Sequence, residues 1–175
     1  METLGLLGIV DLTSEDEART RNVGECLGRC LAAGDVILLH GDLGAGKTTL
    51  AQGIARGLGV GGYVQSPTFT LVHEHDGQTA DGTPVRLYHL DLYRLSGEDD
   101  LDSFGYDEYL APSDGVSVIE WPERAAGRLP GRYLLVRLEL VGDSKRRLVV
   151  DPHPQEESWQ SAIEALRHAA ISGAS

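Results

Sequence analysis

Residues 35–48 read Asp-Val-Ile-Leu-Leu-His-Gly-Asp-Leu-Gly-Ala-Gly-Lys-Thr. The apolar run at the start of this stretch is typical of a short strand buried on both faces of a parallel sheet. A glycine-rich turn follows it. Apolar residues at helical spacing, Leu50, Ile54 and Leu58, then predict a helix over about 47–58. A strand, a glycine turn and a helix in this order favour an α/β architecture.

The turn at residues 41–48 matches the pattern G-x-x-x-x-G-K-[S/T], which is typical of loops that bind nucleotide phosphates. In such loops the backbone N–H groups turn inward around phosphate oxygens, and the following helix N-terminus adds positive potential. Lys47 would reach the outer phosphates, and the Thr48 hydroxyl could complete a Mg²⁺ shell. Thr49 either packs against the preceding strand or lies near the α-phosphate. The predicted nucleotide contacts in this segment are Leu43, Gly44, Ala45, Gly46, Lys47, Thr48 and Thr49.

Helices and strands are predicted along the rest of the chain. The apolar start, residues 1–10, predicts a first strand, and a helix is expected over about 15–32, with Ser14 as its N-cap and Glu17 completing a capping box. Strands are predicted over 69–75, 85–91 and 115–120, an antiparallel pair over 132–141 and 146–150, and a helix over 156–170. We therefore predict one domain, residues 1–175 with a core over about 12–152, folded as a P-loop NTPase-like three-layer sandwich. Its central sheet would be mainly parallel, with antiparallel hairpin additions.

Two acidic residues end predicted strands. Asp91 ends the strand over 85–91, and Glu120 ends the more apolar strand over 115–120. A P-loop enzyme needs a carboxylate near Mg²⁺, and ligands of open α/β sheets bind at the carboxyl ends of the strands. One of the two could hold Mg²⁺ while the other polarises the attacking water. Alternatively, Glu120 is a solvated residue at the end of its strand, and Asp91 caps the turn that follows it. Trp121 places a large ring beside Glu120, either as a core anchor or as a lid or partner contact.

The net charge of −12 argues against a broad surface that grips nucleic acid phosphates, because such surfaces depend on clustered Lys and Arg. If the protein serves RNA, a partner is expected to hold the RNA. Cys26 and Cys30 are predicted to be buried thiols, which suits a reducing cytosol, and the N-terminus lacks the basic leader of a signal peptide. A cytoplasmic protein is therefore expected.

Four motifs in order resemble one family closely. They are Gly41-Asp-Leu-Gly-Ala-Gly-Lys-Thr-Thr49, Ser66-Pro-Thr-Phe-Thr-Leu71, His89-Leu-Asp-Leu-Tyr-Arg-Leu95 and Glu120-Trp-Pro122. Their order and spacing resemble the TsaE (YjeE) family of bacterial tRNA threonylcarbamoyladenosine biosynthesis proteins. The resemblance covers roughly residues 12–124. The first motif by itself indicates only a P-loop, whereas the other three together are specific.

The resemblance implies a Mg²⁺-dependent ATPase that works with the TsaB–TsaD pair to install the threonylcarbamoyl group on the tRNA adenosine beside the anticodon. The transfer itself would belong to the partner, and tRNA would be contacted through it. Residues 43–48 would hold the triphosphate of ATP, Thr48 and Glu120 would bind Mg²⁺, and Asp91 would complete the arrangement of metal and water. Thr68 would sense the γ-phosphate, and Glu17 would contact the nucleotide. Lys47, Asp91 and Glu120 are thus the candidate catalytic residues. The protein is expected to be a monomer or to self-associate weakly, and no contact with membranes is expected.

Two other functions remain open at this point. A small-molecule kinase would use the same loop and Mg²⁺ to phosphorylate a metabolite. A nucleotide-switched binding module would bind ATP to create a partner surface and hydrolyse it very slowly. The basic run Lys145-Arg146-Arg147 could supply a phosphate or base contact, but we favour a solvated hairpin for it.

Overall fold

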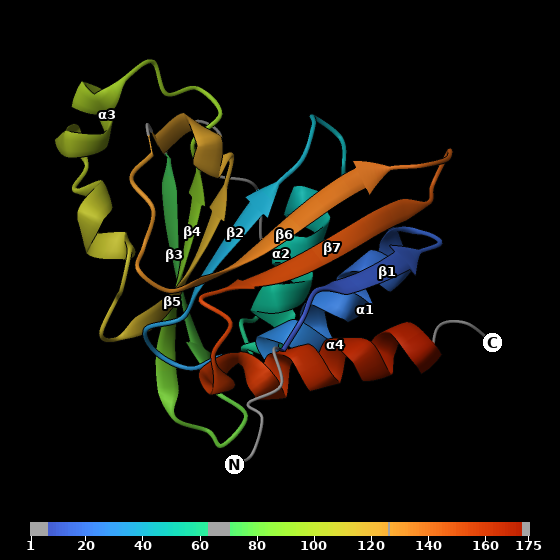
Figure 1. Cartoon of the computed structure of the whole chain (residues 1–175). Coiled ribbons are helices and arrows are strands. Elements are labelled where there is room, and N and C mark those ends of the chain that lie inside the picture. Colours follow the sequence, from blue (N-terminus) through green and yellow to red (C-terminus); the bar gives the residue numbers. More distant parts are fainter. Residues whose placement is uncertain (1–6, 63–70, 126, 173–175) are drawn as a thin grey trace, which may run out of the picture.

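A computed structural model describes residues 7–62, 71–125 and 127–172. These residues form a seven-stranded mixed sheet with the strand order β1-β7-β6-β2-β5-β4-β3 (Figure 1). The sheet is parallel at its centre, where β2 (Val36–His40) pairs with β5 (Gly115–Glu120) and β6 (Tyr133–Leu140), and β5 pairs with β4 (Pro84–Asp91). Both edges are antiparallel: β3 (Val72–Gln78) pairs with β4, and β7 (Arg146–His153) lies between β6 and β1 (Val10–Ser14). The predicted parallel centre with antiparallel additions is confirmed.

Helices cover both faces of the sheet. Alternate residues of β2 point to opposite sides, so Ile37 and Leu39 join one core cluster and Val36 and Leu38 join the other. The first cluster is closed by α1 (Glu17–Gly28), α2 (Lys47–Gly57), α4 (Gln160–Ser172) and the short 3-10 helix η3 (Glu157–Trp159). The second is closed by α3 (Glu98–Ser103) and the 3-10 helices η1 (Tyr106–Tyr109) and η2 (Pro122–Ala125). The α/β three-layer prediction is confirmed.

Helices α1 and α2 touch backbone to backbone through glycines. Gly24 and Gly28 of α1 face Gly53 and Gly57 of α2, and a Cβ atom added at Gly53 would overlap the carbonyl oxygen of Arg21. Only glycine leaves room for so close an approach. The contact fixes α2 against α1, and with it the start of α2 that follows the glycine-rich loop.

The N-terminal predictions are partly wrong. Strand β1 begins at Val10, so residues 7–9 lie outside it, while residues 1–6 lie outside the described ranges. Ser14 is not an N-cap: it is the last residue of β1, paired with Arg146 of β7, and its hydroxyl lies 2.7 Å from the hydroxyl oxygen of Thr20. Asp16 is the N-cap of α1, since its side chain accepts a hydrogen bond from the backbone N–H of Arg19 at 2.8 Å. The capping box is therefore wrong because pairing with β7 turns Ser14 into the core.

Smaller boundary errors occur elsewhere. Helix α1 ends at Gly28 rather than near residue 32, and α4 starts at Gln160 because a 3-10 turn precedes it. The strand expected over 69–75 runs over Val72–Gln78, and residues 69 and 70 lie outside the described ranges. Cys26 and Cys30 are free thiols of intermediate exposure, not buried ones.

In residues 7–62, 71–125 and 127–172 we find no helix with the length and apolar character needed to cross a membrane.

Candidate nucleotide-binding site

The site is built at the carboxyl end of β2, where the chain turns into α2 (Figure 1). Gly44 and Gly46 have φ angles of 81° and 106°, a region that side chains disfavour, so glycine is required for this turn. Gly46 is also the N-cap of α2, and within the described part of the chain no side chain caps this helix start. The first backbone N–H groups of α2 are therefore available to an anion.

A pocket of about 470 Å³ opens at this loop. It contains most of the side chains predicted for the site, together with Tyr93, Arg94, Trp121 and Arg146. Its lining residues are Glu17, Leu43, Gly44, Gly46, Lys47, Thr48, Thr49, Asp91, Tyr93, Arg94, Glu120, Trp121 and Arg146. Ala45 does not line the pocket, because its side chain is buried in the core cluster under α2. Thr68 lies outside the described residues.

Glu120 is the central carboxylate of the pocket. It is only 2% exposed, and its Oε1 atom accepts a hydrogen bond from the Thr48 hydroxyl at 2.9 Å. Its Oε2 atom lies 2.6 Å from Nε2 of His89. Asp91 is paired with Glu120 in register across β4 and β5, and its Oδ1 accepts a hydrogen bond from the backbone N–H of Tyr93. The two predicted acids thus lie on adjacent strand ends beside the start of α2.

Lys47 is folded back onto its own loop. Its ammonium group donates hydrogen bonds to the carbonyl oxygens of Gly41 and Asp42 at 2.5 and 2.8 Å, and it lies 4.3 Å from the centroid of the Trp121 ring. Burial lowers the pKa of Lys47, and the negative charge of Glu120 and of other nearby carboxylates opposes this shift. The ammonium is thus held close to the acids by neutral partners that a phosphate could replace.

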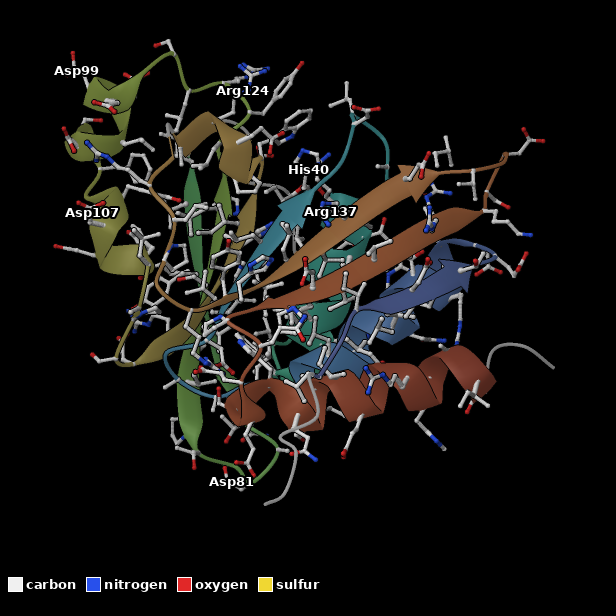
Figure 2. All side chains as sticks on the ribbon, in the orientation of Figure 1. His40, Asp81, Asp99, Asp107, Arg124 and Arg137 are labelled. Carbon is white, nitrogen blue, oxygen red and sulfur yellow. The ribbon has the colours of Figure 1, made fainter. Side chains whose placement is uncertain are left out.

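Aromatic rings form one rim of the pocket. Trp121 has a φ of 60°, unusual for a residue with a side chain, and its ring lies 4.9 Å from that of Tyr93. The guanidinium carbon of Arg124 lies 5.7 Å from the centroid of the Tyr93 ring and 5.8 Å from the centroid of the Trp121 ring. Figure 2 shows Arg124 at the same end of the sheet as His40, where β2 finishes. Trp121 lines the pocket and also packs against the second core cluster.

The solvated hairpin expected for residues 145–147 is wrong for Arg146. This side chain lines the pocket beside Gly46 and donates a hydrogen bond to the Ser144 carbonyl oxygen at 2.7 Å. Arg147 instead forms an exposed ion pair with Asp11. The alternation of β7 explains the difference, because Arg146 shares a face with the buried Leu148 and Arg147 points the other way. The alternation of side chains along a strand is the sequence signal that could have distinguished Arg146 from Arg147.

The fold and the glycine loop define a protein of the P-loop NTPase-like class. Known proteins similar to this chain point to one family within that class. Residues 14–148 match the family model described as threonylcarbamoyl adenosine biosynthesis protein TsaE. The chain is 42% identical over 139 residues to the tRNA threonylcarbamoyladenosine biosynthesis protein TsaE of a Nostoc species, covering 78% of this chain and 82% of the relative. It is 43% identical over 150 residues to the protein of that name from Mycobacterium bovis, covering 82% and 87%.

A solved structure shares the fold. The crystal structure of Bacillus subtilis YdiB superposes with a TM-score of 0.70 at 28% identity, over 92% of this chain and 95% of that one. The chain belongs to the TsaE family of tRNA threonylcarbamoyladenosine biosynthesis proteins. The resemblance drawn from the four motifs is confirmed, whereas the roles of individual site residues stay predictions.

Proposed function

We propose that this chain is a cytoplasmic, Mg²⁺-dependent ATPase. It acts with the TsaB–TsaD complex to form the threonylcarbamoyl group on the tRNA adenosine next to the anticodon. The observation that carries the proposal is the hydrogen bond between Thr48 and Glu120. It lies at the start of α2, the helix that follows the glycine-rich loop of residues 41–48, which we call the phosphate loop in this proposal. This hydrogen bond joins the loop and the strand-end acid within one pocket large enough for a nucleotide.

The loop and Lys47 would bind the triphosphate. Backbone N–H groups of residues 43–48 and the N-terminus of α2 provide donors and positive potential for phosphate oxygens. Lys47 would exchange the Gly41 and Asp42 carbonyls for the outer phosphates, which carry full negative charge and make stronger hydrogen bonds. Glu17, in the first turn of α1, lines the same pocket and would contact another part of the nucleotide.

The residues present also fit a Mg²⁺ ion. Thr48 and Glu120 offer a hydroxyl oxygen and a carboxylate oxygen 2.9 Å apart. Mg²⁺ prefers oxygen ligands, of which a few come from the protein and the others from phosphates and water. When bound, Mg²⁺ would neutralise the charge that develops on the phosphates. Asp91, on the neighbouring strand end, would orient and polarise the attacking water.

The charge distribution supports a protein partner rather than direct tRNA binding. The chain carries a net charge of −12, and α3 with η1 adds exposed acids, among them Asp99 and Asp107, on the outer side of the second helical layer (Figure 2). Such a surface repels RNA phosphates. The tRNA would therefore be held by TsaB–TsaD.

ATP hydrolysis by the purified chain tests the proposal, measured with Mg²⁺, alone and with TsaB–TsaD and tRNA. Wild type is compared with Lys47→Ala and Glu120→Ala, and Arg147→Ala, in an exposed ion pair outside the pocket, is the control. Turnover that rises with the partners, persists in the control and is lost in both site variants would support the proposal. Turnover indifferent to the partners but stimulated by a small metabolite would instead indicate a kinase.

A further inference from the structure

His89 lies directly behind the acid of the proposed site. It sits on β4, is 1% exposed, and its Nε2 lies 2.6 Å from Oε2 of Glu120. The other oxygen of Glu120 accepts the hydroxyl of Thr48. The carboxylate is thus held at both oxygens, by the first turn of α2 on one side and by β4 on the other.

Packing alone does not account for a histidine at this position. Val85 and Leu87 precede it on the same face of β4 and belong to the apolar core, and its neighbours in the sheet are Val118 of β5 and His73 of β3. An apolar side chain here would leave no buried polar ring nitrogen to satisfy. Within the described residues Nδ1 of His89 is buried with no hydrogen-bond partner, which is unfavourable. The ring is therefore kept at a cost that its contact with Glu120 offsets.

We propose that His89 is a positioning residue that fixes the orientation of the Glu120 carboxylate. This inference rests on the proposed function. As the donor to Oε2, the Nε2–H group of His89 prevents rotation of the carboxylate and leaves Oε1 directed at Thr48, where Mg²⁺ would bind. Groups that hold a metal ligand from behind in this way change metal affinity by roughly 10–100-fold when they are removed.

The test uses three variants and a fluorescent ATP analogue. His89→Leu removes the hydrogen bond, His89→Gln can place an amide N–H near the position of Nε2, and His89→Asn is polar but too short to reach Glu120. Nucleotide affinity is measured in EDTA and then across a Mg²⁺ titration, with thermal unfolding to check the fold. The kcat and KM for hydrolysis are measured alongside.

We expect the Leu and Asn variants to bind the analogue in EDTA as wild type does, and to need roughly 10–100-fold more Mg²⁺ for half-maximal effect, with a lower kcat. The Gln variant should recover most of the loss. If the Leu variant does not fold, the comparison of Gln with Asn carries the same test.

Two results would overturn the role of His89 alone. One is a wild-type Mg²⁺ requirement in the Leu and Asn variants. The other is an equal loss in Gln and Asn, which would make the effect one of packing. A wild-type protein that shows no Mg²⁺-dependent nucleotide binding would overturn both this role and the proposed function.

Discussion

Arg146 and Arg147 are adjacent in the chain, yet the pleat of β7 sends their side chains to different surroundings. Arg146 lines the pocket next to Gly46 of the glycine-rich loop, residues 41–48. Arg147 donates two hydrogen bonds to the carboxylate of Asp11, at 3.0 and 2.6 Å, and this pair is exposed. The two arginines have the same charge and the same flexibility, so they separate a local contact with the proposed nucleotide from a general effect of positive charge.

We predict that Arg146→Ala weakens nucleotide binding by at least about tenfold, because a charge-assisted hydrogen bond contributes roughly 1.5–3 kcal/mol. Arg147→Ala should leave the affinity unchanged. A fluorescence titration of both variants and wild type at one salt concentration checks this. Equal weakening in the two variants would mean that Arg146 acts only through the overall charge.

Local pattern predicted much of the candidate site, and contacts across the sheet determined the rest. The loop residues and Lys47 follow from spacing along the chain, and Asp91 and Glu120 follow from their positions at strand ends. The alternation of β7 distinguishes Arg146 from Arg147, but the position of β7 beside the glycine-rich loop has no local pattern. The contact between His89 and Glu120 likewise depends on the register of β4 against β5.

Among the elements, the pair α1 and α2 matters most to the candidate site because it positions the glycine-rich loop. The two helices cross at glycines, with Gly24 and Gly28 against Gly53 and Gly57. Any added side-chain atom at Gly53 would push α2 away from α1, since the obstacle is the backbone carbonyl of Arg21 rather than a flexible side chain.

We expect Gly53→Ala to lower the free energy of unfolding by about 2–3 kcal/mol, the cost of overpacking, despite the better helix propensity of alanine. The matched control is Gly61→Ala, where an added Cβ atom meets nothing within 4 Å. Urea denaturation of both variants measures the difference. A Gly53→Ala protein as stable as the control would show that the helices can separate freely.

The sequence predicted the presence of helices and strands better than the residues at which they begin and end. The strand β2, the glycine turn and α2 were predictable because each has a strong local pattern. The capping box at Ser14 was wrong because the pairing of β1 with β7, more than 130 residues apart in the chain, commits Ser14 to the sheet. Such long-range pairing overrides a local capping pattern.

At the scale of the whole molecule, the sheet separates two cores. The smaller one, under α3 and η1, contains the buried Tyr106, whose hydroxyl donates a hydrogen bond to the Arg128 carbonyl oxygen at 3.3 Å. Burial, with a smaller contribution from the charge of Asp107, raises the pKa of Tyr106 to about 12. An unfolded tyrosine has a pKa of about 10.

This difference predicts a loss of stability in alkali. Because the folded pKa is the higher one, the contribution of Tyr106 is fully present below about pH 10 and is lost as the pH rises toward about 12. The free energy of unfolding of wild type should therefore fall by about 2 kcal/mol more than that of Tyr106→Phe over this range. Denaturant titrations at several pH values measure both. Parallel pH profiles would contradict the prediction.

The proposed nucleotide site is tested most directly by calorimetric titration of ATP into the purified chain in the presence of Mg²⁺, with wild type and Lys47→Ala compared under identical conditions. We predict saturable binding of one ATP per wild-type chain, weakened by at least about tenfold when the Lys47 ammonium is removed. Absence of binding by wild type, or equal affinity in the Lys47→Ala variant, would contradict the assignment of this pocket as the ATP site.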